Sequence, residues 1–113
     1  MAVFKVHQIH VHQTQEVQDL LIGAVEGGSN YWAQFSTKGG DFYDFDKEGY
    51  ALNVHDKEGG KDYTLDLKAI SKGLRVFAKK SPLLYQDFLN NNMDGETSDC
   101  FLQCCVFGEI VYG

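Results

Sequence analysis

The chain has little proline, little tryptophan and no long hydrophobic run. Of its 113 residues, only Pro82 is a proline and only Trp32 is a tryptophan, although aromatic residues together make up 13%. Disordered chains are richer in proline and poorer in aromatic residues, so this composition argues against extended disorder. The longest apolar run, from Leu20 to Val25, is far shorter than the ~20 residues that a transmembrane helix needs. We therefore expect a single domain over residues 1–113 that does not insert into a membrane.

Positive charge is also scarce. The chain has 10 Lys and Arg residues against 16 Asp and Glu residues, which gives a formal charge of -6. Binding to nucleic-acid phosphates requires clustered cations, and the only adjacent basic pair is Lys79-Lys80. The net charge predicts no direct nucleic-acid partner. It is compatible with binding to a basic surface on another protein, such as a nucleic-acid channel, but excludes nucleic acid more firmly than it nominates that partner.

A secretory signal and a disulfide framework are missing as well. The N-terminal sequence MAVFKVHQIHVHQ lacks an apolar block and a small-residue cleavage site, so we expect the protein in a reducing cytoplasm. Its cysteines, Cys100, Cys104 and Cys105, are an odd number bunched within six residues and form no CxxC pair. Apolar neighbours surround them, and no basic side chain nearby could activate them. We expect buried thiols that pack as small hydrophobic side chains.

The spacing of apolar residues predicts one helix near the N-terminus and further helices in the C-terminal half of the chain. Positions three and four residues apart are apolar at about residues 15–26, 67–79 and 97–107. Ser81-Pro82 is typical of a helix start and predicts a shorter helix that reaches Leu89. These patterns predict three to four helices.

Short β-like runs occupy the middle of the chain. The segments YWAQF, FYDF, YALNVHD and DYTLDL lie between Tyr31 and Leu67 and are divided by glycine-bearing connections, which is typical of an antiparallel meander. We also expect one strand over residues 2–13, with a bulge near His7 and Gln8, and a short strand over residues 109–112. The predicted fold is α+β, with a small antiparallel sheet packed against the helices in a single domain.

No motif for catalysis, metal binding or cofactor binding is visible. The chain contains no GxSxG, HExxH or glycine-rich phosphate loop. The segment from Asp44 to Tyr50 imitates the start of a calcium loop, but its twelfth position is His55, which cannot supply a bidentate carboxylate. His10 and His12 alternate along a predicted strand and give only two of the ligands that zinc needs. We expect no enzyme activity, no metal and no cofactor.

Two segments combine glycine, carboxylate and aromatic residues: EGGSNYW at residues 26–32 and GEIVYG at residues 108–113. In a structural interpretation, the first segment ends a helix and buries Trp32 in the core. In a functional interpretation, one surface stacks on and hydrogen-bonds a planar partner. The candidate binding residues of that surface are Glu26, Asn30, Tyr31, Trp32, Glu109 and Tyr112. A partly exposed Trp32 would favour the functional interpretation, and a buried Trp32 the structural one.

These segments resemble elements of a group of small proteins encoded by bacteriophages and prophages. The resemblance rests on residues 26–32, which follow an N-terminal helix, and on FGEIVYG at residues 107–113. A weaker similarity is the predicted helix with Leu67, Gly73 and Leu74. Cys104-Cys105-Val106 departs from the expected polar-aromatic-alanine run and leaves the role of the cysteines open. The resemblance implies a phage setting and an architecture but no particular activity.

Small size, acidity and the lack of a visible catalytic set lead to a first hypothesis. The chain is expected to be a phage-encoded binding protein in the host cytoplasm that binds a host protein, for example by inhibiting a defence system such as a CRISPR effector. The alternative is a protein that binds or sequesters a small, nucleotide-like signal.

Overall fold

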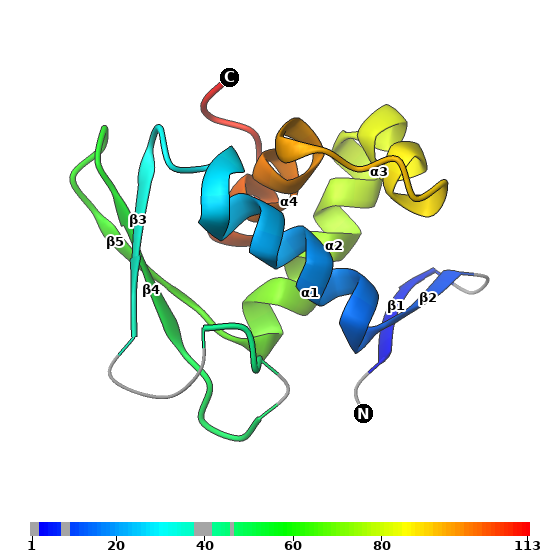
Figure 1. Ribbon diagram of the computed structural model, residues 1–113, viewed down its shortest axis with the longest axis horizontal. Helices are drawn as coiled ribbons and strands as arrows, with labels where there is room; N and C mark the ends of the chain where they lie inside the picture. The colour runs from blue at the N-terminus through cyan, green and yellow to red at the C-terminus, as the bar shows by residue number, and fades with distance from the viewer. Residues whose placement is uncertain (1–2, 8–9, 38–41, 46) are drawn as a thin grey trace.

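The computed structural model describes residues 3–7, 10–37, 42–45 and 47–113 (Figure 1). In chain order the elements are β1 (Val3–His7), β2 (His10–Gln13), α1 (Thr14–Gly23), the π-helical turn η1 (Ala24–Gly28), β3 (Ala33–Ser36), β4 (Leu52–Asp56), β5 (Asp62–Leu65), α2 (Leu67–Lys80), α3 (Pro82–Leu89) and α4 (Gly95–Phe107). An antiparallel sheet with strand order β3-β4-β5 lies on one side of the helices, and the β1–β2 hairpin lies on the other (Figure 1). The predicted α+β class is confirmed.

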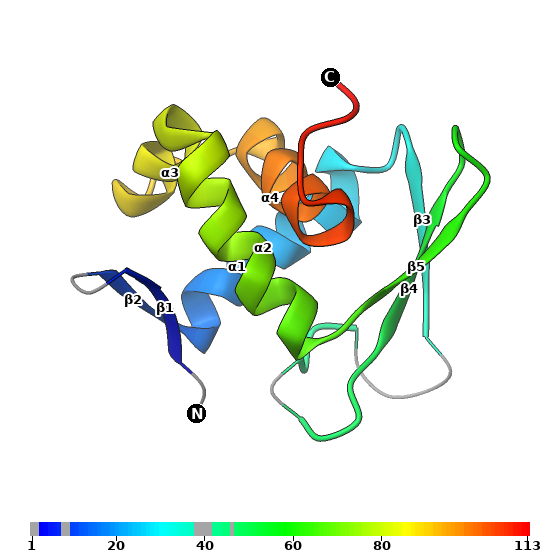
Figure 2. The same cartoon turned by 180° about the vertical axis from the view of Figure 1, so that it is seen from behind.

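Five of the other elements pack around helix α4. It contacts α1, η1, α2, α3 and β5, and Figure 2 shows α2 beside it with α1 behind. The rings of Phe77 on α2 and Phe101 on α4 are 6.0 Å apart and meet edge to face. Gly73 allows the two helices to approach closely, because a Cβ atom there would lie 2.5 Å from the Cα of Cys105. The core thus forms mainly between helices, and the sheet adds its inner face.

Side-chain caps fix the starts of α2 and α4. The carboxylate of Asp66 accepts a hydrogen bond from Ala69 N at 2.9 Å, as expected for an N-cap at this position. Helix α4 begins at Gly95, before the predicted start at about residue 97, because Asp94 acts as the N-cap and accepts from Thr97 N at 3.0 Å. Gly108 ends α4 in the left-handed conformation, with φ 73°. The predicted end of this helix is confirmed, whereas its predicted start is wrong.

Three predicted strands differ from the structure. The single strand expected over residues 2–13 is an antiparallel hairpin in which His7 pairs with His10, and the pairing is irregular between Lys5 and His7. Gln8, where a bulge was also expected, lies outside the described residues. FYDF forms turns rather than a strand; its Tyr43 carbonyl oxygen accepts a hydrogen bond from Gln18 of α1 at 3.1 Å. Residues 109–112 form no strand, and the side chain of Gln103 binds the backbone of Val111 and Tyr112 instead.

Strand β4 shows how the sheet divides its faces. Leu52, Val54 and Asp56 are buried and alternate with half-buried Asn53 and His55. This alternation is expected for a sheet with one face on the core.

Within the described ranges, no helix is long and apolar enough to cross a membrane.

Candidate functional site

Helix α4 places two buried polar side chains, Asp99 and Gln103, one turn apart on the same face. The Oδ1 atom of Asp99 accepts hydrogen bonds from Ser29 Oγ at 2.7 Å and from Trp32 Nε1 at 2.8 Å. Its Oδ2 atom accepts from Tyr31 OH at 2.6 Å and from Gln103 Nε2 at 3.0 Å. A buried carboxylate without a hydrogen-bond donor would be strongly destabilising, so these four donors allow it to lie in the core. Three of the four come from EGGSNYW.

Gln103 binds the second segment. Its Oε1 atom accepts from the backbone N–H groups of Val111 and Tyr112, both at 2.8 Å. Its Nε2 atom donates to the carbonyl oxygen of Tyr112 at 3.0 Å. The side-chain amide thereby takes the place of a neighbouring strand, which explains why residues 109–112 pair with no β-strand.

Tyr112 extends these contacts to the sheet. Its hydroxyl group lies 2.9 Å from both carboxylate oxygens of Asp56, to which it donates. Asp56 Oδ1 also accepts from the backbone N–H groups of Glu58 and Gly59 at 3.1 Å, which fixes the β4–β5 turn. A continuous chain of hydrogen bonds therefore runs from Ser29, Tyr31 and Trp32 through Asp99, Gln103 and Tyr112 to Asp56. We call it the Asp99–Gln103 network.

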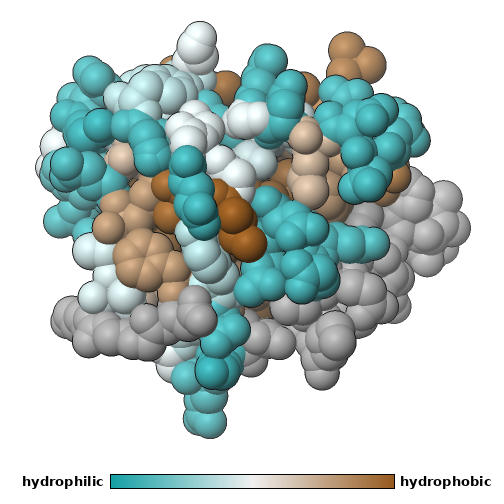
Figure 3. Space-filling model, viewed as in Figure 1, coloured by the Kyte–Doolittle hydropathy of each residue, from teal (hydrophilic) through white to brown (hydrophobic). Residues whose placement is uncertain are grey.

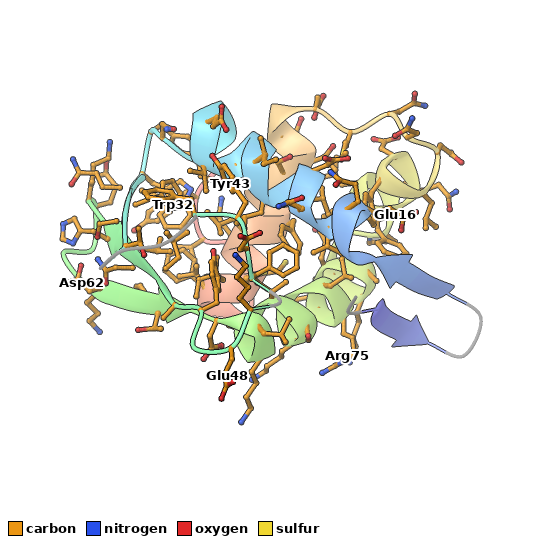
Figure 4. All side chains as sticks on the ribbon, turned by 60° about the horizontal axis from the view of Figure 1, so that its bottom comes forward. Glu16, Trp32, Tyr43, Glu48, Asp62 and Arg75 are labelled. Carbon is orange, nitrogen blue, oxygen red and sulfur yellow. The ribbon has the colours of Figure 1, made fainter. Side chains whose placement is uncertain are left out.

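Trp32 lies inside the molecule, between the sheet and the helices (Figure 4). Its side chain is 0% exposed, and its ring centroid lies 5.1 Å from that of Phe107 and 5.6 Å from that of Tyr112. This burial is the outcome expected from the structural interpretation. The ring of Trp32 is not available to stack on a ligand in this conformation.

Packing against α4 explains why the second glycine of EGGSNYW, Gly28, has no side chain. A Cβ atom at this position would collide with the carbonyl oxygen of Gly95, the first residue of α4. At the neighbouring Gly27, a Cβ atom would meet nothing within 4 Å. Only Gly28 is therefore needed for the close approach of η1 to α4, which in turn brings Ser29 to Asp99.

The other candidate residues lie nearer the surface. Tyr31 is 51% exposed although its hydroxyl group is turned inward to Asp99, and Tyr112 is half-buried. Glu26 is exposed and accepts a hydrogen bond from Tyr43 OH at 2.6 Å. Exposed Asn30 donates from Nδ2 to the Val25 carbonyl oxygen at 3.1 Å. Exposed Glu109 has no hydrogen-bond or ion-pair partner in the described part of the chain.

Burial and hydrogen bonds to carboxylates keep the two network tyrosines protonated. Burial and the bond to Asp99 raise the pKa of Tyr31 well above its usual value. The same two causes, with Asp56 as the carboxylate, raise the pKa of Tyr112. Both hydroxyl groups therefore act as hydrogen-bond donors at neutral pH and not as bases.

The cysteines are also protonated at neutral pH. Burial raises the pKa of Cys100 to about 11 and that of Cys104 to about 12, and it raises the pKa of Cys105 well above 9.0. Nucleophilic attack requires a thiolate, so these thiols are poor nucleophiles. Only Cys104 is buried, whereas Cys100 and Cys105 are half-buried, so the expectation of buried thiols is wrong for those two. All three pack against the hydrophobic core.

A groove lies along β3, the edge strand of the three-stranded sheet. It has a volume of about 590 Å³. Apolar Val25, Ala33, Phe35 and Phe42 and polar Asn30, Gln34, Ser36, Asn53, His55 and Lys57 line it. Figure 3 shows hydrophobic surface between the sheet and the helices on this face. Of the predicted binding residues only Asn30 reaches the groove, and Lys57 Nζ donates to its carbonyl oxygen at 2.7 Å.

Charge is divided unevenly between α2 and the rest of the molecule. Five of the 10 basic residues lie on α2, which has no acidic residue: Lys68, Lys72, Arg75, Lys79 and Lys80. The remaining chain has 16 acidic residues against five basic ones, a formal charge of -11. A count of adjacent basic residues misses this division, whereas the spacing of four, three and four residues from Lys68 to Lys79 reveals it.

The network residues Ser29, Asp56, Asp99 and Gln103 were also missed by sequence reasoning. The available signal was that Asp99 and Gln103 lie four residues apart in a helix with a predicted buried face.

The residues that the structure describes contain no group of three or more His, Cys, Asp or Glu side chains arranged to hold a metal ion. Comparisons of the chain with protein-family models, curated proteins and solved structures found no match.

Proposed function

We propose that this protein is a small acidic binding protein, encoded by a phage, that acts in the host cytoplasm on a basic surface of a host protein. The observation that carries the proposal is the charge of -11 outside helix α2. Such a charge attracts basic surfaces and speeds encounter with them. A defence effector of the CRISPR type fits as a partner, because it presents a basic channel for nucleic acid.

One acidic patch is the best candidate for the contact. The close approach of Gly28 to Gly95 brings the EGGSNYW segment beside the start of α4. Glu26, Asp94 and Glu96 are exposed around this contact. Tyr31 is half-exposed, and its hydroxyl group binds Asp99, which lies one helical turn further along α4. A half-exposed tyrosine held in place by a hydrogen bond to a buried carboxylate is a suitable interface anchor, since its side chain has little freedom left to lose.

The proposal is tested by pull-down of the tagged protein from a bacterial lysate, followed by mass spectrometry. The double variant E26Q/E96Q removes two charges from the patch, and E48Q/E58Q removes two exposed charges elsewhere as a matched control. We expect a host protein that the wild type and the control capture and that E26Q/E96Q captures at least tenfold less. Equal capture by all three proteins would remove the patch, and recovery of no host protein would argue against a protein partner altogether.

The finer proposal, inhibition of a defence system, needs a cellular readout. The protein is expressed in bacteria that carry a CRISPR effector targeted against an infecting phage, and plaques are counted. Inhibition predicts that plaques return with the wild type and with E48Q/E58Q but not with E26Q/E96Q. Plaque numbers that stay low with the wild type would contradict inhibition of that effector.

The groove along β3 supports a second candidate function, the binding of a small nucleotide-like ligand. Phe42 offers an aromatic face, the Asn53 amide can hydrogen-bond a base, and Lys57 carries the charge that a phosphate requires. Mass spectrometry of molecules released from the purified protein tests this candidate. A nucleotide that the wild type retains and the N53A variant loses would support it. A protein that yields no bound small molecule and gives no calorimetric signal with a panel of nucleotides would contradict it.

A further inference from the structure

We infer that the outer face of α2 binds the phosphate backbone of a nucleic acid. The inference goes beyond the proposed function and does not rest on it. It reverses the expectation of no nucleic-acid contact, which the net charge of -6 had favoured.

The cations of α2 form a row. Lys68, Lys72, Arg75 and Lys79 are spaced by four, three and four residues, so they share one helix face over roughly 16 Å. All four are exposed, as is the neighbouring Lys80. Figure 4 shows Arg75 extending away from the body of the molecule.

No ion pair in the described part of the chain neutralises this row. None of the five cationic side chains of α2 has an ion-pair or hydrogen-bond partner among the described residues, and the helix carries no carboxylate beyond its N-cap, Asp66. Like charges at these spacings destabilise a helix by about 0.2–0.5 kcal/mol per pair. A chain with 16 carboxylates that places none of them on this helix maintains a cationic surface, which an external polyanion would neutralise.

The composition of the face distinguishes a nucleic acid from other polyanions. The exposed residues of α2 are its five cations and, at the first position, Leu67. Protein interfaces are depleted in lysine and have an apolar centre, which this face lacks. A helix that lies in a membrane interface needs an apolar face toward the lipid, whereas the apolar face of α2, with Ile70, Leu74 and Phe77, is buried against the rest of the protein. Phosphate contacts require only Lys and Arg, and they carry no sequence preference.

The acidic remainder of the protein does not cancel this attraction at moderate salt. The molecule measures 36 × 32 × 20 Å, while electrostatic interactions in 0.1 M salt are screened beyond about 10 Å. Carboxylates on the far side of the protein are therefore screened from a nucleic acid that contacts α2. Four phosphate contacts predict that log K falls with log salt with a slope of about -3.6 on duplex DNA, a loss of about a hundredfold between 50 and 200 mM.

The test is fluorescence anisotropy with the full chain and two labelled 20-base-pair duplexes of unrelated sequence, in 50 to 200 mM salt. We expect equal affinity for both duplexes and a slope near the predicted value. The variant K72Q/R75Q should reduce the slope by about 2 and weaken binding at 50 mM at least tenfold. K47Q/K61Q, which removes two exposed cations outside α2, is the matched control and should bind within twofold of the wild type.

Circular dichroism melts show whether each variant is folded. If K72Q/R75Q is not folded, K68Q/K79Q tests the same row. Three outcomes would overturn the inference: no saturable binding to either duplex at 50 mM, equal losses in the α2 and control variants, or saturable binding to anionic vesicles or polyglutamate with none to DNA.

Discussion

Gln103 pairs with Tyr112 as a neighbouring strand would. Its side-chain nitrogen donates to the Tyr112 carbonyl oxygen at 3.0 Å, and its side-chain oxygen accepts from Tyr112 N at 2.8 Å. One buried amide thus fixes the last residues of the chain on helix α4. Asp99, one turn earlier, binds EGGSNYW through the side chains of Ser29, Tyr31 and Trp32, so the two segments are joined through one helix.

Replacing Gln103 with leucine should release the C-terminal segment. The substitution keeps an apolar body of similar size but leaves the backbone groups of Val111 and Tyr112 without their partner. We expect the free energy of unfolding to fall by about 1–3 kcal/mol, since the buried Asp99 carboxylate loses one of its four donors and the part-buried backbone groups of Val111 and Tyr112 lose their partner. Urea denaturation measures the loss, and hydrogen exchange should show lost protection at Val111 and Tyr112. A loss below 1 kcal/mol with protection retained would mean that the amide contributes little.

Trp32 should behave as a core residue. Trp32→Ala is expected to lower the free energy of unfolding by about 3–5 kcal/mol, because it removes a fully buried ring that packs on Phe107 and Tyr112. Trp32→Phe keeps an aromatic ring but loses the indole donor to Asp99, which should cost about 1–3 kcal/mol. Because Trp32 is the only tryptophan, the tryptophan fluorescence of the protein comes from this residue alone. This fluorescence should resist quenching by acrylamide. Strong quenching in the folded protein would contradict its burial.

The two glycines of EGGSNYW should respond differently to alanine. Gly28→Ala introduces a collision with the Gly95 carbonyl oxygen, and overpacking of this kind costs about 1–3 kcal/mol. Gly27→Ala meets open space, so its effect should lie within about 0.5 kcal/mol. Thermal melts of both variants provide the comparison. Equal effects at the two positions would argue against a close contact between η1 and α4.

The thiols should be unreactive in the folded protein at pH 8. Cys100 and Cys104 have pKa values raised to about 11 and about 12, so iodoacetamide, which reacts with thiolates, should label them slowly until the protein is unfolded in urea. The folded state favours the protonated thiols. Their contribution to stability is therefore fully present below pH 9, the ordinary thiol range, and is lost as the pH rises through 11 to 12. Rapid labelling of the folded protein at pH 8 would contradict the raised pKa values.

Asp99→Asn should separate the network from simple packing. The asparagine has the same shape but offers one acceptor oxygen in place of two, so at least one of the donors Ser29, Tyr31 and Trp32 loses its partner. The expected cost is about 1–3 kcal/mol by urea denaturation. The pKa of Tyr31 should also fall toward its usual value, because the bond to Asp99 helps to raise it. Spectroscopic titration measures this shift against Tyr31→Phe, and an unchanged titration curve would contradict the role of Asp99.

The sequence by itself determined the elements whose signals are local. Helical spacing predicted α2 and the end of α4, and a proline at the first turn predicted α3, because periodicity and backbone conformation depend on neighbouring residues alone. The α+β class followed from the same patterns. EGGSNYW and GEIVYG were recognised as related, although the reason for their relation was not visible in either segment.

Only the tertiary structure decided what these segments do. Ser29 and Asp99 are 70 residues apart in the chain and share a hydrogen bond of 2.7 Å, a pairing that no local pattern encodes. The same holds for the last residues, which have the composition of a strand but bind the side chain of Gln103. A polar side chain in a buried position is stable only where its partners converge from distant parts of the chain, and that convergence is a property of the folded chain.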